Sequence, residues 1–263
     1  MKTLILYFSA TGNSLEVAKK MQKKLEGGSH HSVDIVSMRQ VKPDRDLGQY
    51  DTIGFVYPCF FLSAPDFILK TIDSLDLPTG AFYFGVCTVN KHDGHAGAQL
   101  SQALEKKGCH LSYYSRLVMV GNYIMMYSPP KTEKAAKLLD KADQKLDGIL
   151  DGIVGKQTRA SRRRGQWFST AYYGLFESHK TKSGDLFQVS EACVSCGICA
   201  KVCSFSNIEM IKGKPVWADA CEHCTACIHW CPKEAVNYGR STEKRRRYTH
   251  PQTTVKEIFY QRE

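Results

Sequence analysis

The stretch Thr3-Leu4-Ile5-Leu6-Tyr7-Phe8-Ser9-Ala10-Thr11-Gly12-Asn13-Ser14 joins an apolar run to a turn of small and hydroxylated residues. Its first six residues are short, apolar and rich in β-forming types, which is typical of a strand buried on both faces. After the turn, apolar residues recur at helical spacing as far as Leu25, and lysines occupy the opposite face. The order strand, turn, helix predicts the first unit of a parallel sheet.

The same alternation continues through the first half of the chain. Further strands are expected over 33–36, 52–57, 81–86 and 117–120, and further helices over 67–75, 99–104 and 135–153. Five strands joined by helical crossovers predict a doubly wound parallel sheet, an α/β fold, over residues 1–155.

The turn after the first strand is expected to bind a phosphate group. It precedes a helix, where free backbone N–H groups and the positive end of the helix dipole face an anion. The candidate residues are Ser9, Ala10, Thr11, Gly12, Asn13 and Ser14. The turn has neither the lysine of a Walker loop nor the G-x-G-x-x-G fingerprint. In the alternative interpretation, Asn13 or Ser14 only caps the helix, and Asn13 to Glu16 form a capping box.

Residues 1–155 resemble the flavodoxin family in this loop and in the expected strand order. The resemblance implies that the first loop holds the phosphate of FMN and that two further loops enclose its isoalloxazine ring. Those loops contain Tyr57, Pro58, Cys59, Phe60 and Phe61 after the third strand, and Cys87, Thr88, Val89, Asn90 and Gly94 after the fourth. Flavodoxins are usually acidic, whereas this half carries 18 basic and 16 acidic residues, so its docking partners should differ.

Several residues in the two ring loops have a second interpretation. Phe60 and Phe61 could cover a flavin face or simply pack in the core. Cys59 and Cys87 could form a redox-active pair, although buried apolar cysteines are far commoner.

Eight of the eleven cysteines lie in two runs in the second half. The first run is Cys193-x2-Cys196-x2-Cys199-x3-Cys203, and the second is Cys221-x2-Cys224-x2-Cys227-x3-Cys231-Pro232. This spacing is typical of proteins with two [4Fe–4S] clusters, in which the fourth cysteine of each run binds the other cluster. Zinc is the rival metal. A four-cysteine zinc site uses paired C-x2-C units, however, so a C-x2-C-x2-C run would have one cysteine too many.

Cluster I is therefore expected on Cys193, Cys196, Cys199 and Cys231, and cluster II on Cys221, Cys224, Cys227 and Cys203. Each fourth cysteine is expected to open a short helix. Residues 184–240 resemble the bacterial two-cluster ferredoxin family, a small α+β fold, with an entry strand at 187–189 and a hairpin at 208–211 and 214–217. Ser204 stands where that family usually has proline. His223 and His229 are expected to be surface or packing residues.

The two halves together resemble flavodoxin–ferredoxin fusion proteins. The resemblance implies an electron-transfer protein that passes electrons between FMN and two [4Fe–4S] clusters, to or from a redox partner. Residues 156–183 are expected to form a basic and aromatic linker, and residues 241–263 a basic extension. A self-contained reductase of a small substrate and a redox-sensing nucleic-acid binder are the alternative classes, so an enzymatic activity stays undecided.

The net charge of +10 limits the choice of partners. Part of it can balance the negative charge of clusters and phosphate, and part can steer an acidic ferredoxin or flavoprotein. Nucleic-acid binding through 162–164 and 244–247 would need a recognition motif, and none accompanies these runs. A solvated basic linker and tail is the simplest interpretation. No apolar run approaches the roughly 18 residues of a membrane span, and no export signal is recognised, so a cytoplasmic location is the default expectation.

Overall fold

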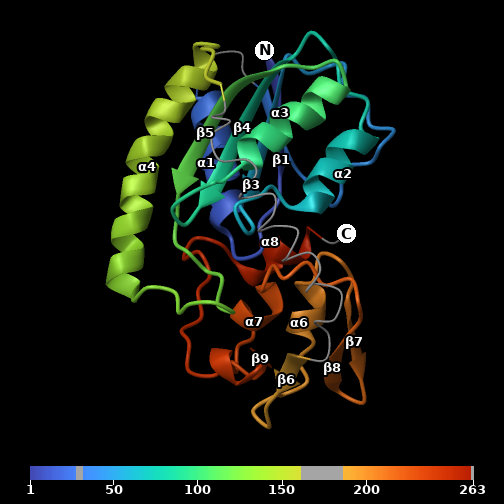
Figure 1. Ribbon diagram of the computed structural model, residues 1–263, viewed down its shortest axis with the longest axis vertical. Coiled ribbons are helices and arrows are strands. Elements are labelled where there is room, and N and C mark those ends of the chain that lie inside the picture. Colours follow the sequence, from blue (N-terminus) through green and yellow to red (C-terminus); the bar gives the residue numbers. More distant parts are fainter. Residues whose placement is uncertain (28–31, 161–185, 262–263) are drawn as a thin grey trace.

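The computed structural model describes residues 1–27, 32–160 and 186–261. A five-stranded parallel sheet forms the centre of the first half, with the strand order β2-β1-β3-β4-β5 (Figure 1). Its strands are β1 (Lys2–Tyr7), β2 (Ser32–Ser37), β3 (Thr52–Pro58), β4 (Phe82–Val89) and β5 (Leu111–Val118). The reversal of strand order beside β1 is where open α/β sheets bind ligands, at the carboxyl ends of the strands.

Helices cover both faces of this sheet, which confirms the doubly wound α/β fold. Helix α1 (Asn13–Glu26) packs beside α4 (Thr132–Val154), and α2 (Asp66–Ser74) packs beside α3 (Ala96–Lys106) (Figure 1). The apolar run of β1 is completely buried at Leu4, Ile5 and Leu6, as expected for a strand with helices on both sides.

The fifth strand differs from the sequence-based expectation. It spans Leu111–Val118 rather than 117–120, and it pairs with β4 from Tyr83 to Val89. Ser112 and Arg116 interrupt its apolar pattern because β5 is an edge strand. Beyond α4, Arg159 forms a bridge to Tyr113 on this edge and hydrogen-bonds its backbone to Ser112 and Tyr114. Residues 119–131 are therefore a connection, not part of the sheet.

The described part of the second half forms a small domain of short elements. Strand β6 (Phe187–Val189) pairs with β9 (Val236–Tyr238), and β7 (Ile208–Ile211) pairs with β8 (Lys214–Trp217), both antiparallel. The helical elements are α6 (Ile198–Lys201), α7 (Ala226–His229), η2 (Arg240–Thr242) and α8 (Val255–Phe259). The entry strand and the hairpin lie where the sequence predicts them.

The helices near the cysteines differ from the prediction. Helices α6 and α7 contain the third cysteine of each run and end before the fourth, so Cys203 and Cys231 do not open helices. Both helices begin after a residue in the left-handed conformation, Gly197 and Thr225. The chain thus forms one helical turn directly from the cysteine loop, and the fourth cysteine follows as that turn ends.

The small domain packs against the lower end of the sheet domain (Figure 1). Phe205 inserts its ring beside Phe8 and Phe67, at centroid distances of 6.0 and 4.9 Å. Arg39 donates from Nε to the carbonyl of Ser204 at 3.0 Å. Ser204, which stands where the two-cluster ferredoxins usually have proline, therefore lies in the contact between the domains. Within the described ranges, no helix is long and apolar enough to cross a membrane.

Replacing Gly54 should destabilise the sheet, because a Cβ there would overlap the ring of Phe84 on the neighbouring strand. We expect Gly54→Ala to lower the free energy of unfolding by about 2 kcal/mol, the cost of overpacking a core. Gly148→Ala is the matched control, since its Cβ meets nothing within 4 Å on helix α4 and alanine favours a helix by about 1 kcal/mol. Urea denaturation followed by circular dichroism measures both. Equal stability of Gly54→Ala and the wild type would contradict this packing.

Candidate functional site

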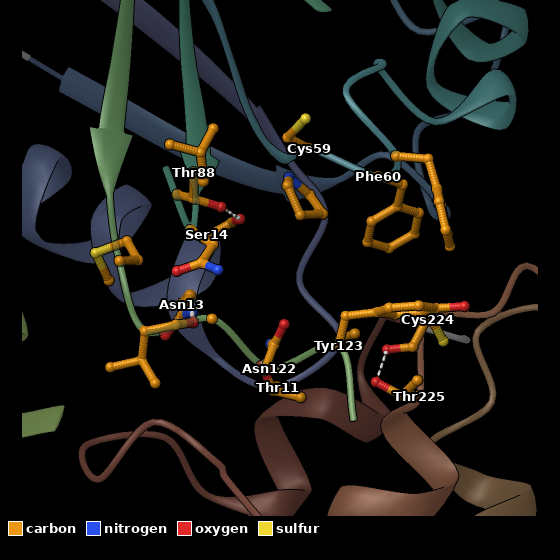
Figure 2. A pocket seen from close by; sticks show the side chains of 18 of the residues that line it. Thr11, Asn13, Ser14, Cys59, Phe60, Thr88, Asn122, Tyr123, Cys224 and Thr225 are labelled. Carbon is orange, nitrogen blue, oxygen red and sulfur yellow. Dashed lines mark hydrogen bonds between the residues drawn. The ribbon is translucent and has the colours of Figure 1, made fainter. Parts of the chain in front are cut away.

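A cavity of about 330 Å³ lies at the carboxyl ends of the strands and reaches the small domain (Figure 2). Three loops predicted from sequence line it together. The predicted residues on its wall are Ser9, Ala10, Thr11, Asn13, Ser14, Pro58, Cys59, Phe60, Phe61, Thr88, Val89 and Asn90. The phosphate-binding candidates and the ring-loop candidates therefore face one space.

Four predicted residues are not part of the cavity wall. Tyr57 and Cys87 are completely buried in the sheet behind it. Gly94 adopts a positive φ of 55° where a Cβ would overlap the backbone of Leu62. Gly12 has a φ of 101° and shapes the turn without lining the cavity. These two glycines support the loops through their backbone conformation.

The turn at residues 9–14 leaves the start of helix α1 open. Gly12 is the N-cap residue, and no side chain caps the helix. The interpretation of Asn13 or Ser14 as a cap, with a capping box, is therefore wrong. The first-turn N–H groups have no partner within the helix, which makes this end of α1 suited to an anion.

The three hydroxyls of this turn are buried, and the hydrogen bonds they make suit a phosphate oxygen. Ser9 Oγ accepts from the N–H of Gly12 at 3.1 Å, and Thr11 Oγ1 accepts from Asn122 Nδ2. Ser14 Oγ and Thr88 Oγ1 form a hydrogen bond of 2.8 Å in which either hydroxyl can donate (Figure 2). A hydroxyl that already accepts a hydrogen bond keeps its own proton for donation. Ser9 and Thr11 can each donate into the cavity.

The connection after β5 supplies a wall that the sequence did not predict. It contributes Met119, Val120, Gly121, Asn122, Tyr123, Met126 and Tyr127, and the other loops add Leu62 and His92. The ring of Tyr123 meets that of Phe61 edge-on at 4.8 Å between centroids. No sequence motif marks this segment. Because the sequence predicts a strand at 117–120, it assigns residues 119 and 120 to the sheet instead of to the cavity wall. A correct placement of β5 would have put these residues at the carboxyl edge of the sheet.

Cys87 lies on β4, Cys59 directly follows β3, and both are free thiols. Burial, together with a hydrogen bond to Cys59, raises the pKa of Cys87 well above its usual range. Burial also raises the pKa of Tyr57 beside them. Both groups are held in their neutral forms, which is typical of packing residues rather than of an activated thiolate.

One set of cysteines surrounds a small cavity in the C-terminal domain. Its wall includes Cys193, Cys196, Cys199 and Cys231. Burial, together with the charges of Cys231, Cys196 and Cys193, raises the pKa of Cys199 to about 11. Cys196 is exposed to solvent, so this cavity lies at the molecular surface.

The other four cysteines also lie close together. Burial raises the pKa of Cys227 well above its usual range, and the charges of Cys224, Cys221 and Cys203 add to the effect. Cys224 lines the main cavity together with His223 and Thr225 (Figure 2). In the part of the chain that the structure describes, no three side chains of histidine, cysteine or acidic type are grouped to hold a single metal ion.

Both histidines near the cysteines are buried, so neither is a surface residue. His229 Nδ1 accepts from the N–H of Tyr248 at 3.1 Å, so Nε2 carries the proton and donates to the carbonyl of Asn122 at 2.7 Å. Burial lowers the pKa of His229 to about 4, and the neutral imidazole can act as both donor and acceptor. His229 therefore joins the cysteine domain to the connection after β5.

The basic run at 244–247 is largely used inside the molecule. Arg245 donates to the carbonyl of Ile124 at 2.7 Å, and Arg246 donates to that of Pro129 at 2.8 Å. Arg247 instead donates to the carbonyl of Val236 and to Asn237 in the small domain. Arg245 and Arg246 thus bond to the sheet domain and Arg247 to the small domain, so this part of the extension is not a solvated tail. The other predicted basic run, 162–164, lies outside the described residues.

Residues 4–114 match the sequence model of the flavodoxin domain. Among solved structures, a flavodoxin of Streptococcus pneumoniae TIGR4 is 16% identical, with a TM-score of 0.44, over 59% of this chain and 99% of that one. Flavodoxin 1 of Bacillus cereus is 19% identical, with a TM-score of 0.38, over 54% and 95%. No curated protein matches the chain. The first half therefore has a flavodoxin-like fold.

Proposed function

We propose that the chain is an electron-transfer protein that passes electrons between two [4Fe–4S] clusters and FMN, to or from a redox partner. One observation carries the proposal. A single cavity joins the turn at 9–14, both loops expected around a flavin ring, and Cys224 from the second cysteine run. FMN exchanges one or two electrons and each cluster exchanges one, so a chain that holds both can collect or split an electron pair.

The residues of the cavity fit FMN at both ends. The open start of α1 and the hydroxyls of Ser9 and Thr11 suit a phosphate group. Pro58, Phe60 and Tyr123 offer an apolar and aromatic surface for a ring system. No lysine or arginine side chain lines this cavity within the described residues. The phosphate would therefore be held by hydrogen bonds and the helix dipole rather than by a counter-charge.

The two cysteine sets fit the expected cluster assignments. One cavity is lined by Cys193, Cys196, Cys199 and Cys231. The pKa of Cys227 is raised by the nearby charges of Cys224, Cys221 and Cys203. Four cysteines around one cavity suit a cluster, in which each thiolate binds a different iron. We propose a flavodoxin-like domain at 1–155, a linker at 156–183, a two-cluster domain at 184–240 and an extension at 241–263.

The positions of the two sets suggest an order for electron transfer. Cys224 brings the second set to the wall of the flavin cavity, whereas Cys196 of the first set is exposed. A protein partner that delivers single electrons would dock at the exposed set. Two such deliveries, with protons from water, balance the two-electron reduction of FMN. The net charge of +10 favours an acidic partner.

The flavin assignment is tested by adding negative charge to the phosphate turn. Thr11→Glu and Ser14→Glu should expel FMN, because a carboxylate would repel the phosphate from a buried site. Flavin absorbance of the purified protein, with iron content as a check on folding, measures the effect. Ser74→Glu adds the same charge at an exposed position on α2 and should leave FMN content unchanged. FAD, or no flavin in anaerobically prepared wild-type protein, would overturn the assignment.

The cluster assignment predicts about eight iron atoms per chain after anaerobic preparation, four for each cluster. Cys224→Ala should remove the signal of one reduced cluster in electron paramagnetic resonance spectra and lower the iron content. Cys109→Ala is the matched control, because Cys109 is a buried free thiol beside the carbonyl of Leu77 in the sheet domain. A loss of cluster signal in Cys109→Ala would show that the ligand assignment is wrong.

The docking position is tested with two valines of nearly equal exposure. Val194 lies in the first cysteine loop and is 57% exposed, and Val154 ends helix α4 and is 56% exposed. Val194→Glu should slow reduction by an acidic low-potential ferredoxin about tenfold, whereas Val154→Glu should not. Added salt should slow the wild-type reaction with that partner. Equal rates for the two variants would contradict docking at the exposed set.

A further inference from the structure

The backbone of the phosphate turn is held by residues more than two hundred positions further along the chain. Gln261 forms two hydrogen bonds with Ser9: it accepts from the N–H at 2.9 Å and donates to the carbonyl at 2.7 Å. Trp230 Nε1 donates to the carbonyl of Ala10 at 2.9 Å. The N–H of His250 donates to the carbonyl of Thr11 at 2.7 Å. Three successive residues of the turn are thus held from the C-terminal half.

The C-terminal segment also packs tightly against Gly12. A Cβ at Gly12 would lie 2.5 Å from Thr253 Oγ1 and 2.7 Å from the Cβ of His250. Thr253 Oγ1 also donates to Glu16 in the first turn of α1 at 2.8 Å. His250 and Thr253 can therefore lie this close to the turn only because residue 12 is a glycine.

The side chain of Asn13 is also held by hydrogen bonds to residues far along the chain. The hydroxyl of Tyr248 donates to Asn13 Oδ1 at 2.7 Å, and Asn13 Nδ2 donates to the carbonyl of Val120 at 3.0 Å. All the amide atoms of this side chain therefore have fixed directions. The C-terminal segment contacts the outside of the turn, while the open start of α1 faces the cavity.

These contacts determine how much order the turn must gain when it binds a ligand. Buried carbonyl and N–H groups need partners, and here Gln261, Trp230 and His250 provide them. A loop that is already fixed in its binding conformation loses less entropy on binding, so its affinity is higher. The C-terminal half therefore prepares the turn for the phosphate.

We propose that Trp230, His250 and Gln261 are positioning residues for the phosphate of FMN, so that flavin affinity depends on the folded state of the cysteine domain. This inference rests on the proposed function. Trp230 directly precedes Cys231, a proposed ligand of the first cluster, so loss of that cluster should disturb the hydrogen bond from Trp230 to Ala10. Coupling of this kind is reciprocal: iron loading strengthens FMN binding, and FMN strengthens retention of the clusters.

The experiment compares FMN and riboflavin binding to the full-length, cluster-loaded protein after removal of its flavin. Fluorescence titration of Gln261→Ala should show about tenfold weaker FMN binding, since two hydrogen bonds to the turn are lost. Riboflavin lacks the phosphate, so its affinity should be unchanged. Gln252→Ala is the control, because Gln252 lies exposed in the same segment. Trp230→Phe, which keeps an aromatic ring but removes the donor, should also weaken FMN selectively.

Equal loss of FMN and riboflavin affinity in Gln261→Ala, or no loss of either, would overturn the positioning role. Iron-free protein should bind FMN more weakly than loaded protein, and equal affinities would overturn the coupling. Failure of the proposed function gives a different result, because the wild-type protein would then bind no FMN at all.

Discussion

The structure depends on how one turn satisfies its backbone groups. Residues 9–14 leave the N–H groups at the start of helix α1 open toward a cavity, so the outer side of the turn needs partners elsewhere. Gln261, Trp230 and His250 supply them from the far end of the chain. The βα turn is thereby one of the places where the two halves of the chain are in contact.

That contact determines what else borders the cavity. With Trp230 bonded to Ala10 and His229 bonded to Asn122, the second cysteine run lies against the sheet domain, and Cys224 reaches the cavity wall. The three arginines at 245–247 hold the same arrangement through carbonyl groups on both sides. The charge that would suit nucleic acid is thus partly used as structural support between domains.

The sequence predicted the features that depend on local patterns. The apolar run before Ser9 predicted β1, and the alternation of strands and helices predicted the doubly wound sheet. The anion site in the turn and the two sets of cluster ligands stay predictions. The sequence predicted a fifth strand but placed it at 117–120, because an edge strand with Ser112 and Arg116 lacks a continuous apolar run. It also missed Tyr123, Gln261 and Tyr248, whose roles arise from contacts between segments far apart in the chain. Such contacts leave no periodicity in a single sequence.

Anaerobic stopped-flow mixing tests most directly whether electrons pass between the cysteine domain and the proposed FMN site. A reduced low-potential ferredoxin should bleach cluster absorbance first and flavin absorbance afterwards, while NADH or NADPH alone should react slowly. Replacing Cys224 by alanine should slow flavin bleaching by that donor. Rapid, saturable flavin reduction by a nicotinamide without a protein partner would contradict electron entry through the clusters and favour a self-contained reductase.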